Sequence, residues 1–592
     1  MNLDQDQIKA VEADSQNILC IAGPGSGKTR TLVERAAHLI EKRKVSPYEL
    51  ALFTFTRYAA QEMKERITER IGPQANHITI GTFHGVALRR LRQFGDLIGY
   101  MPKNVTVYGE FEEQYLLKEC AIDLGIYKKS WKPAKKDILK VFHEYYYRGE
   151  EPNGDDPCAT IFQDFMARCR ENQSLTYGGL LVSLKLLLPH IGKNLQWKHI
   201  MVDEAHDNNL IQWLLIREIQ KICGASLFTV ADLDQSIYKW RGAFPEWILK
   251  HQEEFDIYRL ESNYRSLHEI VEASNRLIQH NTQRIEKTMR TTRFHSDLQP
   301  LIIEEGVDSY RLARYIKGYK KAYPDQKIAV LARIHALLDK LSVELNISGV
   351  PHARIGRKTV LVNSEEFRRF HAFLKLLVNP FDNMSFLLIR DIVGLSRSEY
   401  TKIRLQATQE SKSHFQVWIE KDPEELESWQ GLFKSAPSYD LEDFTTILLN
   451  KLDGGKLEPG FFSEAEFVLD WCAPHMKDTS CIEGPLQQYL EYLATWDIQN
   501  ELGEEETAAV QLMTVHAAKG LEFPIVIIAG CNEGILPSKQ SINADDMEEE
   551  RRLFYVAMTR AEDRLILTIR PTDTERGSSP KSRFVGEALY FR

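Results

Sequence analysis

The sequence predicts an α/β protein with two parallel-sheet cores, each interrupted by a mainly helical inserted subdomain. Its 592 residues exceed what one hydrophobic core usually organises. Short, continuously apolar runs recur between helical patterns, and strands buried on both faces of a parallel sheet have this composition. Two long stretches of mainly helical pattern interrupt these runs, whereas connections inside a compact α/β domain are usually only a few residues long.

The apolar runs fall into two groups along the chain. The first group predicts strands at residues 17–23, 50–56, 78–83, 199–205 and 226–232. The second group predicts strands at residues 327–333, 523–530 and 564–570. We therefore expect a first core from residues 1–85 and 175–260, with a helical insertion at 86–174, and a second core from residues 261–380 and 508–592, with a helical insertion at 381–507.

The composition is that of an ordinary globular protein, with 43% hydrophobic and 27% charged residues. A formal net charge of −9 excludes a uniformly basic nucleic-acid coat protein but leaves room for a local basic groove. No stretch approaches the ~18 consecutive apolar residues of a transmembrane helix, and the acidic start of the chain does not resemble a signal peptide. We expect a soluble, cytoplasmic protein without a membrane partner.

The eight cysteines are scattered, as is usual for reduced thiols in a cytoplasmic protein. One group, Cys472, His475 and Cys481, contains residue types that can bind a metal. It supplies only three soft ligands at irregular spacing, whereas structural zinc sites use four. We therefore expect buried thiols there and no metal centre.

The glycine-rich segment "AGPGSGKT" (22–29) lies between the first apolar run and a helical pattern. Glycines let the backbone wrap closely around phosphates, and the amide groups at the start of the following helix face the anion. Lys28 would reach the β and γ phosphates of a nucleotide, and the Thr29 hydroxyl would bind Mg²⁺. The predicted phosphate-binding residues are Ala22, which replaces the glycine of the strict pattern, Gly23, Pro24, Gly25, Ser26, Gly27, Lys28, Thr29 and Arg30.

An acidic pair, Asp203 and Glu204, closes the apolar run "HIMVDEA" (199–205). An aspartate at the end of a buried strand can hold Mg²⁺, directly or through water. The neighbouring carboxylate is then placed to orient or deprotonate the attacking water. In isolation such a pair is usually surface charge, but its position after a strand and downstream of the glycine-rich loop favours the catalytic interpretation.

Further motifs follow in a fixed order. Together they closely resemble the UvrD/Rep family of superfamily 1 DNA helicases, from about residue 3 to residue 584, with a weaker match in the two insertions. The resemblance implies two RecA-like cores and an ATP-dependent helicase that moves 3′ to 5′ along single-stranded DNA. The motifs are "LDQDQIKAV" (3–11), "FTFTRYAAQEMKERI" (53–67), "GTFHGVALRRLR" (81–92), "VDEAHDNN" (202–209), "ADLDQSIYKWRGA" (231–243), "LESNYRS" (260–266), "VQLMTVHAAKGLEF" (510–523) and "EEERRLFYVAMTRA" (548–561).

The resemblance implies ATP-site roles for residues outside the loop. Gln7 would read the adenine edge, because an amide can pair bidentately with a purine. Arg265 and Arg560 look like arginine fingers, whose planar groups would bind charge developing on the transferred phosphoryl group. The other implied contacts are Tyr264 stacking on the base, Gln235 sensing the γ phosphate, and Glu522 binding the ribose. The implied catalytic set is Lys28, Glu204, Gln235, Arg265 and Arg560, with Thr29 and Asp203 at Mg²⁺.

The resemblance also implies a path for single-stranded DNA. Phe55, Tyr238 and Trp240 match aromatics that contact bases, and stacking tolerates any base sequence. Each aromatic alone would more often be core, and only the joint motifs favour the stacking interpretation. A separate segment, "YKKSWKPAKKDILK" (127–140), either contacts duplex phosphates or is a solvated helix face. The remaining residues implied beside the groove are Thr82, His84, Arg241 and His516.

The chain departs from the family pattern at several points. His206 replaces the usual glutamine after the acidic pair, and Ala231 replaces a common glycine. The segment 174–181 lacks the carboxylates that the family carries there, and 391–400 matches a family hairpin only loosely. The second insertion is shorter than in full-length relatives, and we expect no extended C-terminal tail. Regulatory behaviour of the second insertion therefore cannot be inferred from the resemblance.

Three functions are compatible with these motifs. The leading one is an ATP-dependent DNA helicase of repair, replication, recombination or antiphage defence, acting on single strands and single-strand/duplex junctions. The second is a translocase that removes proteins from DNA or drives a separate nuclease, with a nuclease or repair protein as its candidate partner. The third is a P-loop enzyme acting on a small molecule, in which the DNA motifs would be structural.

Overall fold

A computed structural model gives the fold of the chain. It describes residues 3–101, 105–126, 131–149, 157–294, 299–355, 365–420, 429–435, 441–453, 486, 508–544, 546–571 and 580–589. Contacts divide the chain into two compact units: unit 1 contains Met1–Val86, Gly192–Arg357 and Gln499–Arg592, and unit 2 contains Ala87–Ile191 and Lys358–Ile498. This division groups residues 175–191 with unit 2, although the sequence analysis assigned them to the first core. The predicted four-part boundaries themselves stay a prediction.

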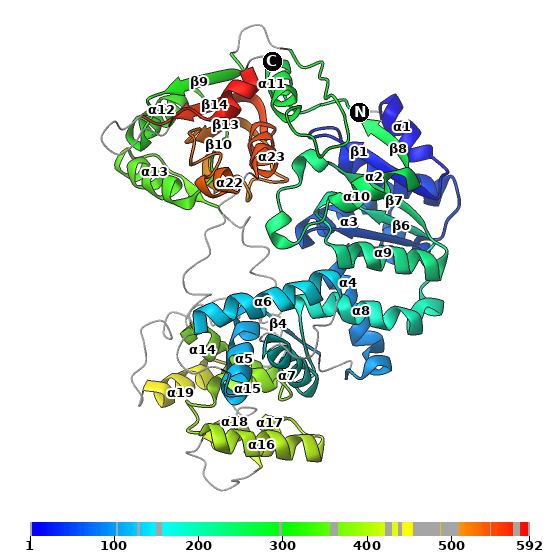
Figure 1. The fold of residues 1–592 in the computed structure, drawn as a ribbon, viewed down its shortest axis with the longest axis vertical. Helices are drawn as coiled ribbons and strands as arrows, with labels where there is room; N and C mark the ends of the chain where they lie inside the picture. Colours follow the sequence, from blue (N-terminus) through cyan, green and yellow to red (C-terminus); the bar gives the residue numbers. More distant parts are fainter. Residues whose placement is uncertain are drawn as a thin grey trace. The chain divides into compact units, whose positions relative to one another are not determined.

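The first sheet of unit 1 has six parallel strands in the order β3-β2-β6-β7-β1-β8 (Figure 1). All five predicted strands of the first group are present in it. The edge strand β8 was not predicted, because only Leu260 of its five residues is buried and the others interrupt the apolar signal. The strands are β1 (Asn17–Ala22), β2 (Leu50–Thr54), β3 (Thr79–Thr82), β6 (His199–Val202), β7 (Ser226–Ala231) and β8 (Asp256–Leu260).

Helices around the first sheet begin at residues that satisfy their free N–H groups. The Thr56 hydroxyl accepts a hydrogen bond from the N–H of Ala59 at 3.0 Å, which starts α3. Asn209 and Gln212 cap the start of α9 reciprocally. By contrast, Gly27 precedes α2 without any side-chain cap, so the first N–H groups of α2 remain for another acceptor. These helices are α1 (Gln5–Glu12), α2 (Lys28–Glu41), α3 (Arg57–Ile71), α4 (Phe83–Phe94), α9 (Leu210–Cys223) and α10 (Glu246–His251).

The second sheet of unit 1 also has six parallel strands, in the order β11-β12-β10-β13-β14-β9. The three predicted strands of the second group are β10, β13 and β14, which lie side by side in the middle of the sheet. Both sheets are thus parallel and helix-covered, which confirms the predicted fold class. The strands are β9 (Leu301–Glu305), β10 (Ile328–Ala332), β11 (Ala353–Arg354), β12 (Val510–Thr514), β13 (Phe523–Ala529) and β14 (Ala561–Ile569).

Two hydrophobic clusters cover the two faces of the second sheet. One joins the sheet to α11, α23 and α24, and the other joins it to α12 and α13. Figure 1 shows these two groups of helices on opposite sides of the strands. The chain directly after α11 stays on this side, since the Asn281 amide donates to the carbonyl of Glu548 on α23 at 3.0 Å. The helices are α11 (His268–Ile278), α12 (Ser309–Ala322), α13 (His335–Ile347), α22 (Lys539–Asn543), α23 (Met547–Met558) and α24 (Arg583–Leu589).

Unit 2 is mainly helical in its described residues. It contains one small sheet, in which β4 (Thr106–Tyr108) pairs in parallel with β5 (Ser174–Thr176). The segment 127–140 falls partly on α6, but residues 127–130 and the side chains of 131–137 lie outside the described part, so its two interpretations stay open. The helices are α5 (Glu110–Asp123), α6 (Trp131–Arg148), α7 (Pro157–Glu171), α8 (Tyr177–Ile191), α14 (Glu365–Val378), α15 (Asn383–Ile389), α16 (Arg397–Glu410), α17 (His414–Ile419), α18 (Trp429–Ser435) and α19 (Leu441–Asp453).

Ion pairs hold the two chain stretches of unit 2 together. Glu119 on α5 pairs with Arg390 at 3.0 Å and with Arg397 at 2.5 Å. Arg397 also pairs with Asp123 at 3.2 Å. The side chains of Glu119 and Arg390 are only 8% and 6% exposed, so each neutralises a charge that would otherwise be buried alone. These contacts join residues that are more than two hundred positions apart in the sequence.

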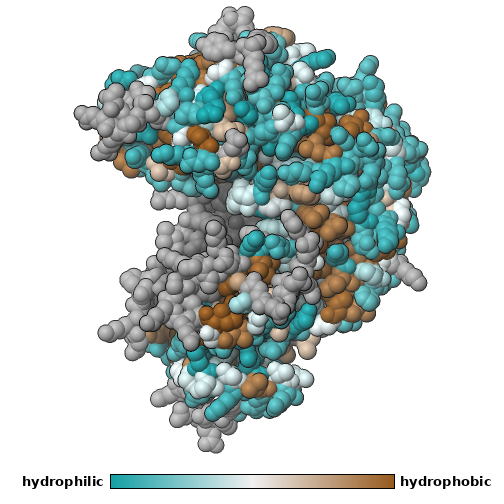
Figure 2. Space-filling model, viewed as in Figure 1, coloured by the Kyte–Doolittle hydropathy of each residue, from teal (hydrophilic) through white to brown (hydrophobic). Residues whose placement is uncertain are grey.

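The face of the molecule drawn in Figure 2 is mainly hydrophilic in its described residues. Hydrophilic residues cover most of the described face drawn in Figure 2, and hydrophobic residues form separate patches on it. Within the described ranges, no helix combines the length and apolar character that a membrane crossing needs. The group Cys472, His475 and Cys481 lies outside the described residues.

Candidate functional site

The carboxyl ends of the first sheet's strands carry most predicted site residues. The loop 23–27 follows β1, the carboxylates 203–204 follow β6, and Gln235 lies in the turn after β7. Phe55 follows β2, and Thr82 ends β3. Because the strands are parallel, all these ends lie on one edge of the sheet. In the strand order, the predicted nucleotide-binding residues follow β6, β7 and β1. The predicted DNA-binding residues Phe55 and Thr82 lie at the ends of the neighbouring strands β2 and β3.

The glycine-rich loop has the backbone that a phosphate cradle requires. Gly25 and Gly27 have φ angles of 69° and 78°, in the region that favours glycine. The Ser26 hydroxyl donates to the carbonyl of Gly23 at 2.7 Å and closes the turn. A Cβ atom on Gly27 would lie 2.9 Å from Gln7 Nε2, so a larger residue would obstruct the cradle. Of the other predicted loop residues, Ala22 ends β1, the Pro24 carbonyl accepts from Asn263, and Lys28, Thr29 and Arg30 form the first turn of α2.

The acidic pair lies against the loop lysine. Lys28 Nζ is 3.0 Å from Glu204 Oε1 and 3.1 Å from Oε2. Burial and the neighbouring Glu204 charge raise the pKa of Asp203 to about 7. Burial also opposes ionisation of Glu204, but the charges of Lys28 and Lys519 outweigh it and lower the pKa of Glu204. One ammonium group thus faces two carboxyl groups, and the Asp203 carboxylate with the Thr29 hydroxyl supplies the hard oxygen ligands that suit Mg²⁺.

Gln7 and Tyr264 lie together at the other end of the loop. Gln7 Nε2 donates to the carbonyl of Ser26 at 2.9 Å, and Gln7 Oε1 accepts from the N–H of Asp4 at 3.0 Å. The Tyr264 hydroxyl donates to Asp4 Oδ2 at 2.6 Å, and the Tyr264 N–H donates to the carbonyl of Gly25 at 2.9 Å. The Gln7 amide keeps a second N–H and a second lone pair for a base edge. The Tyr264 side chain remains half exposed, so a ring face is open to stacking.

Arg560 reaches from the second sheet to the sensor glutamine of the first. Its Nη2 donates to Gln235 Oε1 at 3.0 Å, while Nε and Nη1 donate to the carbonyls of Val556 and Leu521. Burial and the nearby Arg265 charge lower the pKa of Arg560 to about 9, so it is still protonated at pH 7. The Arg560 guanidinium is therefore buried, and its Nη2 is bonded to Gln235.

Arg265 is paired with the predicted ribose contact. Its Nε donates to Glu522 Oε2 at 2.7 Å, and Nη1 donates to the carbonyl of Thr559 at 3.1 Å. A Cβ atom on Gly25 would lie 2.7 Å from Arg265 Cβ, so Arg265 stands directly beside the phosphate loop. Asn263 supports this approach, since its amide donates to the carbonyl of Pro24 at 2.8 Å. The sequence analysis did not single out Asn263, although it lies within the motif 260–266.

Lys519 and His206 are further site residues that the sequence analysis did not assign to the ATP site. Lys519 Nζ lies 2.5 Å from Asp207 Oδ2 and 2.9 Å from the carbonyl of Gln235. It also lies 3.2 Å from Nε2 of His206, whose Nδ1 accepts from the N–H of Asp232 at 3.0 Å. Lys519 belongs to the motif 510–523, but a lysine in a loop gives no sign by itself that it will be buried against the other sheet.

The predicted DNA-stacking residues form one aromatic group. The rings of Phe55 and Tyr238 are stacked, with centroids 5.3 Å apart and an interplanar angle of 13°. Trp240 contacts Tyr238 and His516 edge-on, at 6.4 Å and 6.2 Å. The Arg241 guanidinium lies 4.7 Å from the Trp240 ring centroid. Trp240 is 61% exposed, which is unusual for tryptophan and gives a base a ring face to stack on.

Thr82 and His84 lie at the start of α4, beside this group along the sheet edge. Thr82 pairs in register with Thr54, the residue before Phe55. The Thr82 hydroxyl accepts from the N–H of Gly85 at 3.0 Å, so it caps α4. Burial, with a smaller effect of a nearby arginine charge, lowers the pKa of His84 to about 4. Burial and three nearby cations likewise lower the pKa of His516 to about 4, so both imidazoles are neutral at pH 7.

The sequence matches two family models along most of its length. Residues 3–256 match the UvrD/REP helicase N-terminal domain, and residues 258–443 and 469–571 match the UvrD-like helicase C-terminal domain. The protein named ATP-dependent DNA helicase PcrA of Bacillus subtilis (strain 168) is 30% identical over 651 residues, which cover 99% of this chain and 85% of that protein. The protein of the same name from Staphylococcus aureus (strain NCTC 8325 / PS 47) is 29% identical over 609 residues, which cover 96% and 83%.

These matches agree with the geometry of the site. The two models divide the chain at residues 256–258, within β8, which is the last strand of the first sheet along the chain. The residues that meet around the glycine-rich loop come from both matched parts. The chain belongs to the UvrD/Rep family of helicases.

Proposed function

We propose that the protein is an ATP-driven DNA helicase that moves 3′ to 5′ along single-stranded DNA. One observation carries this proposal: Lys519 contacts both predicted sites. Its Nζ is bonded to Asp207 beside the acidic pair, and it lies 4.9 Å from the ring centroid of Tyr238 in the aromatic group. A change at the nucleotide would thus reach the DNA groove through one short, buried connection.

The ATP site supplies groups for each part of phosphoryl transfer. Glu204 would take a proton from water, whose oxygen then forms a bond to the terminal phosphorus as the bond to the bridging oxygen breaks. Lys28 and Arg560 would bind the charge that develops on the phosphate oxygens. Thr29 and Asp203 would hold Mg²⁺, which when bound adds positive charge at the phosphates. Arg265, beside the loop, would leave Glu522 to bind a phosphate oxygen.

The DNA groove would hold bases without reading their sequence. Trp240 offers an exposed ring, Tyr238 supports it edge-on, and Arg241 adds a positive charge that suits the phosphate backbone. Neutral His84 and His516 would donate hydrogen bonds without a fixed charge. Such a groove suits a motor that must pass every base in turn. Because chromosomal or foreign DNA is the proposed track, we propose that the protein acts in the cytoplasm.

Unwinding assays on tailed duplexes test this proposal. Three substrates share one duplex and carry a 3′ single-stranded tail, a 5′ tail of the same length, or no tail. With ATP and Mg²⁺, we expect strand separation of the 3′-tailed duplex only, and none with a non-hydrolysable ATP analogue. Preferential unwinding of the 5′-tailed duplex would overturn the polarity.

A second readout separates the competing functions. Turnover of ATP that rises with single-stranded DNA, together with displacement of a protein block but no strand separation, would replace the helicase by a translocase. Turnover that is indifferent to DNA would instead favour a P-loop enzyme acting on a small molecule.

A further inference from the structure

A buried group of four charged side chains joins the two sheets of unit 1 and has no part in the chemistry proposed above. Asp232 and Asp234 lie in the turn after β7 of the first sheet. Arg284 and Lys287 follow α11, which packs on the second sheet. All four side chains are at most 8% exposed. We call this group the four-charge cluster.

The cluster is balanced in charge and closely bonded. Lys287 Nζ lies 2.5 Å from Asp232 Oδ1 and also contacts Asp234 Oδ2. Arg284 binds Asp234 with two parallel bonds, of 3.1 Å from Nε and 2.8 Å from Nη2. Burial opposes ionisation of Asp232, but the Lys287 ammonium outweighs it and lowers the pKa of Asp232. Two cations of one sheet therefore neutralise two carboxylates of the other.

Asp232 connects the cluster to the predicted ATP machinery at two points. Its Oδ2 accepts from Gln235 Nε2 at 2.5 Å, and Gln235 Oε1 in turn accepts from Arg560 at 3.0 Å. Its backbone N–H donates to His206 Nδ1 at 3.0 Å, and His206 Nε2 lies 3.5 Å from Glu204 Oε2. An amide side chain can rotate, and the bond to Asp232 fixes which end of Gln235 faces Arg560.

From this geometry we infer that Lys287 is a positioning residue of the ATPase: by holding Asp232 it orients the Gln235 amide toward Arg560, and so sets the catalytic geometry from the second sheet. The inference rests on the proposed function, because it assigns Lys287 a part in ATP turnover. Arg284 differs from Lys287 in one respect that matters. Arg284 bonds Asp234 and the Lys287 carbonyl, but it makes no bond to Asp232.

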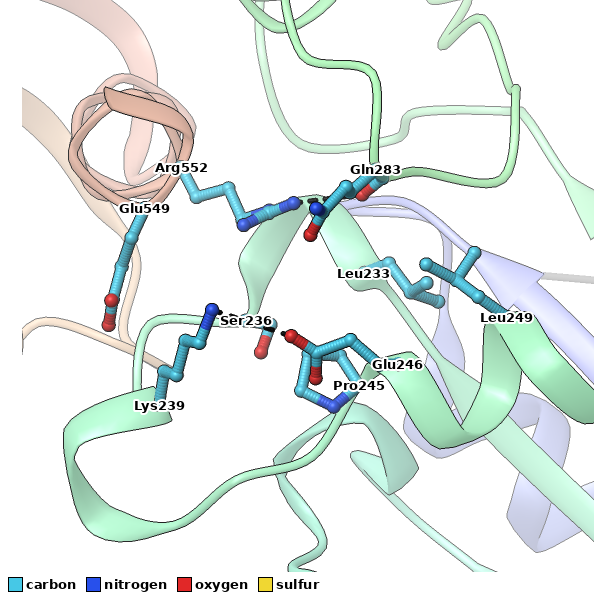
Figure 3. Close-up of a pocket in the computed structure, with 9 residues that line it drawn as sticks. All are labelled: Leu233, Ser236, Lys239, Pro245, Glu246, Leu249, Gln283, Glu549 and Arg552. Atoms are coloured by element: carbon cyan, nitrogen blue, oxygen red, sulfur yellow. Dashed lines mark hydrogen bonds and ion pairs between the residues drawn. The ribbon is translucent and has the colours of Figure 1, made fainter. Parts of the chain in front are cut away.

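The polar contacts in the pocket next to the cluster each lie on the side of one sheet only. Figure 3 shows the adjoining pocket, where Arg552 points toward the carbonyl of Gln283 and Lys239 points toward Glu246. The Arg552 bond, of 2.8 Å, lies on the second-sheet side, and the Lys239–Glu246 pair, of 3.4 Å, lies on the first-sheet side. Among the described residues, the four-charge cluster supplies ionic bonds between the two sheets beside this pocket. Loss of Lys287 would therefore act on Asp232 and leave the pocket walls in place.

The test compares charge deletions at the two cations of the cluster. We expect Lys287→Met to lower kcat of DNA-stimulated ATP hydrolysis by about tenfold or more, because misplaced catalytic groups lose rate steeply, with little change in KM for ATP. Arg284→Met is the matched control, which removes one charge from the same cluster but leaves Asp232 bonded to Lys287. We expect it to lower thermal stability with kcat close to wild type.

A double-variant cycle decides whether Lys287 acts through Gln235. In a Gln235→Leu background the amide is absent, so Lys287→Met should lower kcat by no more than about twofold further. An equal loss of kcat in both backgrounds would overturn the inference, as would kcat of Lys287→Met equal to wild type. A wild-type enzyme without DNA-stimulated turnover would instead count against the proposed function.

A conservative exchange keeps the inference testable if Lys287→Met does not fold. Lys287→Arg retains the positive charge that the two buried aspartates need, but places its donors differently. We expect a folded protein with unchanged thermal unfolding temperature and reduced kcat. Arg284→Lys is the corresponding exchange at the control position. If Lys287→Arg and Arg284→Lys had the same kcat, Lys287 would be a structural residue only.

Discussion

At the scale of single residues, Glu204 carries both the most strained backbone and the most direct chemical role in the proposed site. Its φ and ψ angles are 47° and 43°, in the left-handed region that non-glycine residues seldom adopt. This conformation turns the chain sharply after β6, and the side chain meets Lys28 Nζ at 3.0 Å. The loop lysine thereby holds the carboxylate over the place where phosphates would bind.

The role of Glu204 predicts a selective loss of turnover. Glu204→Gln should lower kcat for ATP by about a hundredfold or more, because the amide keeps the shape but cannot accept a proton. Binding of a fluorescent ATP analogue should remain within a few-fold of wild type. Glu41→Gln, at a half-exposed residue paired with Arg70, is the control and should leave kcat unchanged. A Glu204→Gln enzyme with normal turnover would remove this role.

The geometry of Arg560 predicts that charge alone cannot replace it. Four acceptors surround its planar group, and a lysine could bond only one or two of them from a single point. Arg560→Lys should therefore lower kcat by about a hundredfold or more. Arg564→Lys, four residues later on β14, is the matched control, since Arg564 lies against the rings of Tyr319 and Tyr323. Similar kcat in both variants would contradict the finger role.

At the scale of elements, the strand order of the first sheet arranges the two predicted sites. The predicted strands β1, β2, β6 and β7 have nearly continuous buried runs, which is the signal that central parallel strands give, whereas the predicted edge strand β3 buries only Gly81. The missed strands β8 and β9 lie at sheet edges, where their half-buried patterns with exposed charged residues resemble those of loops. The missed strand β12 is central and almost wholly buried, so edge position does not explain its omission.

Contacts between elements that are distant in the chain could not be predicted from the sequence. The motifs identified Gln235, Arg265 and Arg560, because each lies in a segment with a recognisable pattern. Lys287 lies outside these motifs, and although Lys519 lies within the motif 510–523, a lysine in a loop usually has a solvated side chain. Both become buried only because the second sheet packs against carboxylates of the first. Tertiary packing of this kind is not encoded in local periodicity.

The aromatic group predicts a loss of DNA affinity without a loss of fold. Trp240→Ala should weaken binding of an oligo(dT) single strand by about 1–3 kcal/mol, the usual contribution of one stacked base. Tyr48→Ala is the control, because Tyr48 is also exposed and stacked, on His77, but precedes β2 at the opposite edge of the sheet. Fluorescence anisotropy at fixed salt measures both. Equal affinity of the Trp240 variant and wild type would exclude stacking there.

At the scale of the whole molecule, each unit has its own source of stability. Unit 1 is built on two sheets with hydrophobic faces, whereas unit 2 combines a buried core of aromatic and aliphatic side chains with buried ion pairs between chain stretches far apart in sequence. Glu119 is central to these pairs, because it neutralises both Arg390 and Arg397. Removing it would leave the Arg390 guanidinium with Asp391 as its remaining carboxylate partner.

This arrangement predicts that one substitution destabilises unit 2 selectively. Glu119→Gln should lower the free energy of unfolding of unit 2 by about 1.5–3 kcal/mol, the usual contribution of a hydrogen bond to a charged group, because Asp391 still compensates Arg390. Glu410→Gln, at a partly exposed pair with Lys412, should change it little. Urea unfolding followed by tryptophan fluorescence compares them, with ATP turnover as a readout of unit 1. Equal stabilities would show that the pair contributes no net stabilisation.

We propose that ATP hydrolysis between the two sheets moves the protein along a single strand. The most direct test is steady-state ATP turnover measured at saturating concentrations of oligo(dT) of increasing length. A translocating motor completes more cycles per binding event on a longer strand, so we predict that kcat rises with length and then reaches a plateau. A kcat that is independent of length, once the strand fills the groove, would contradict translocation.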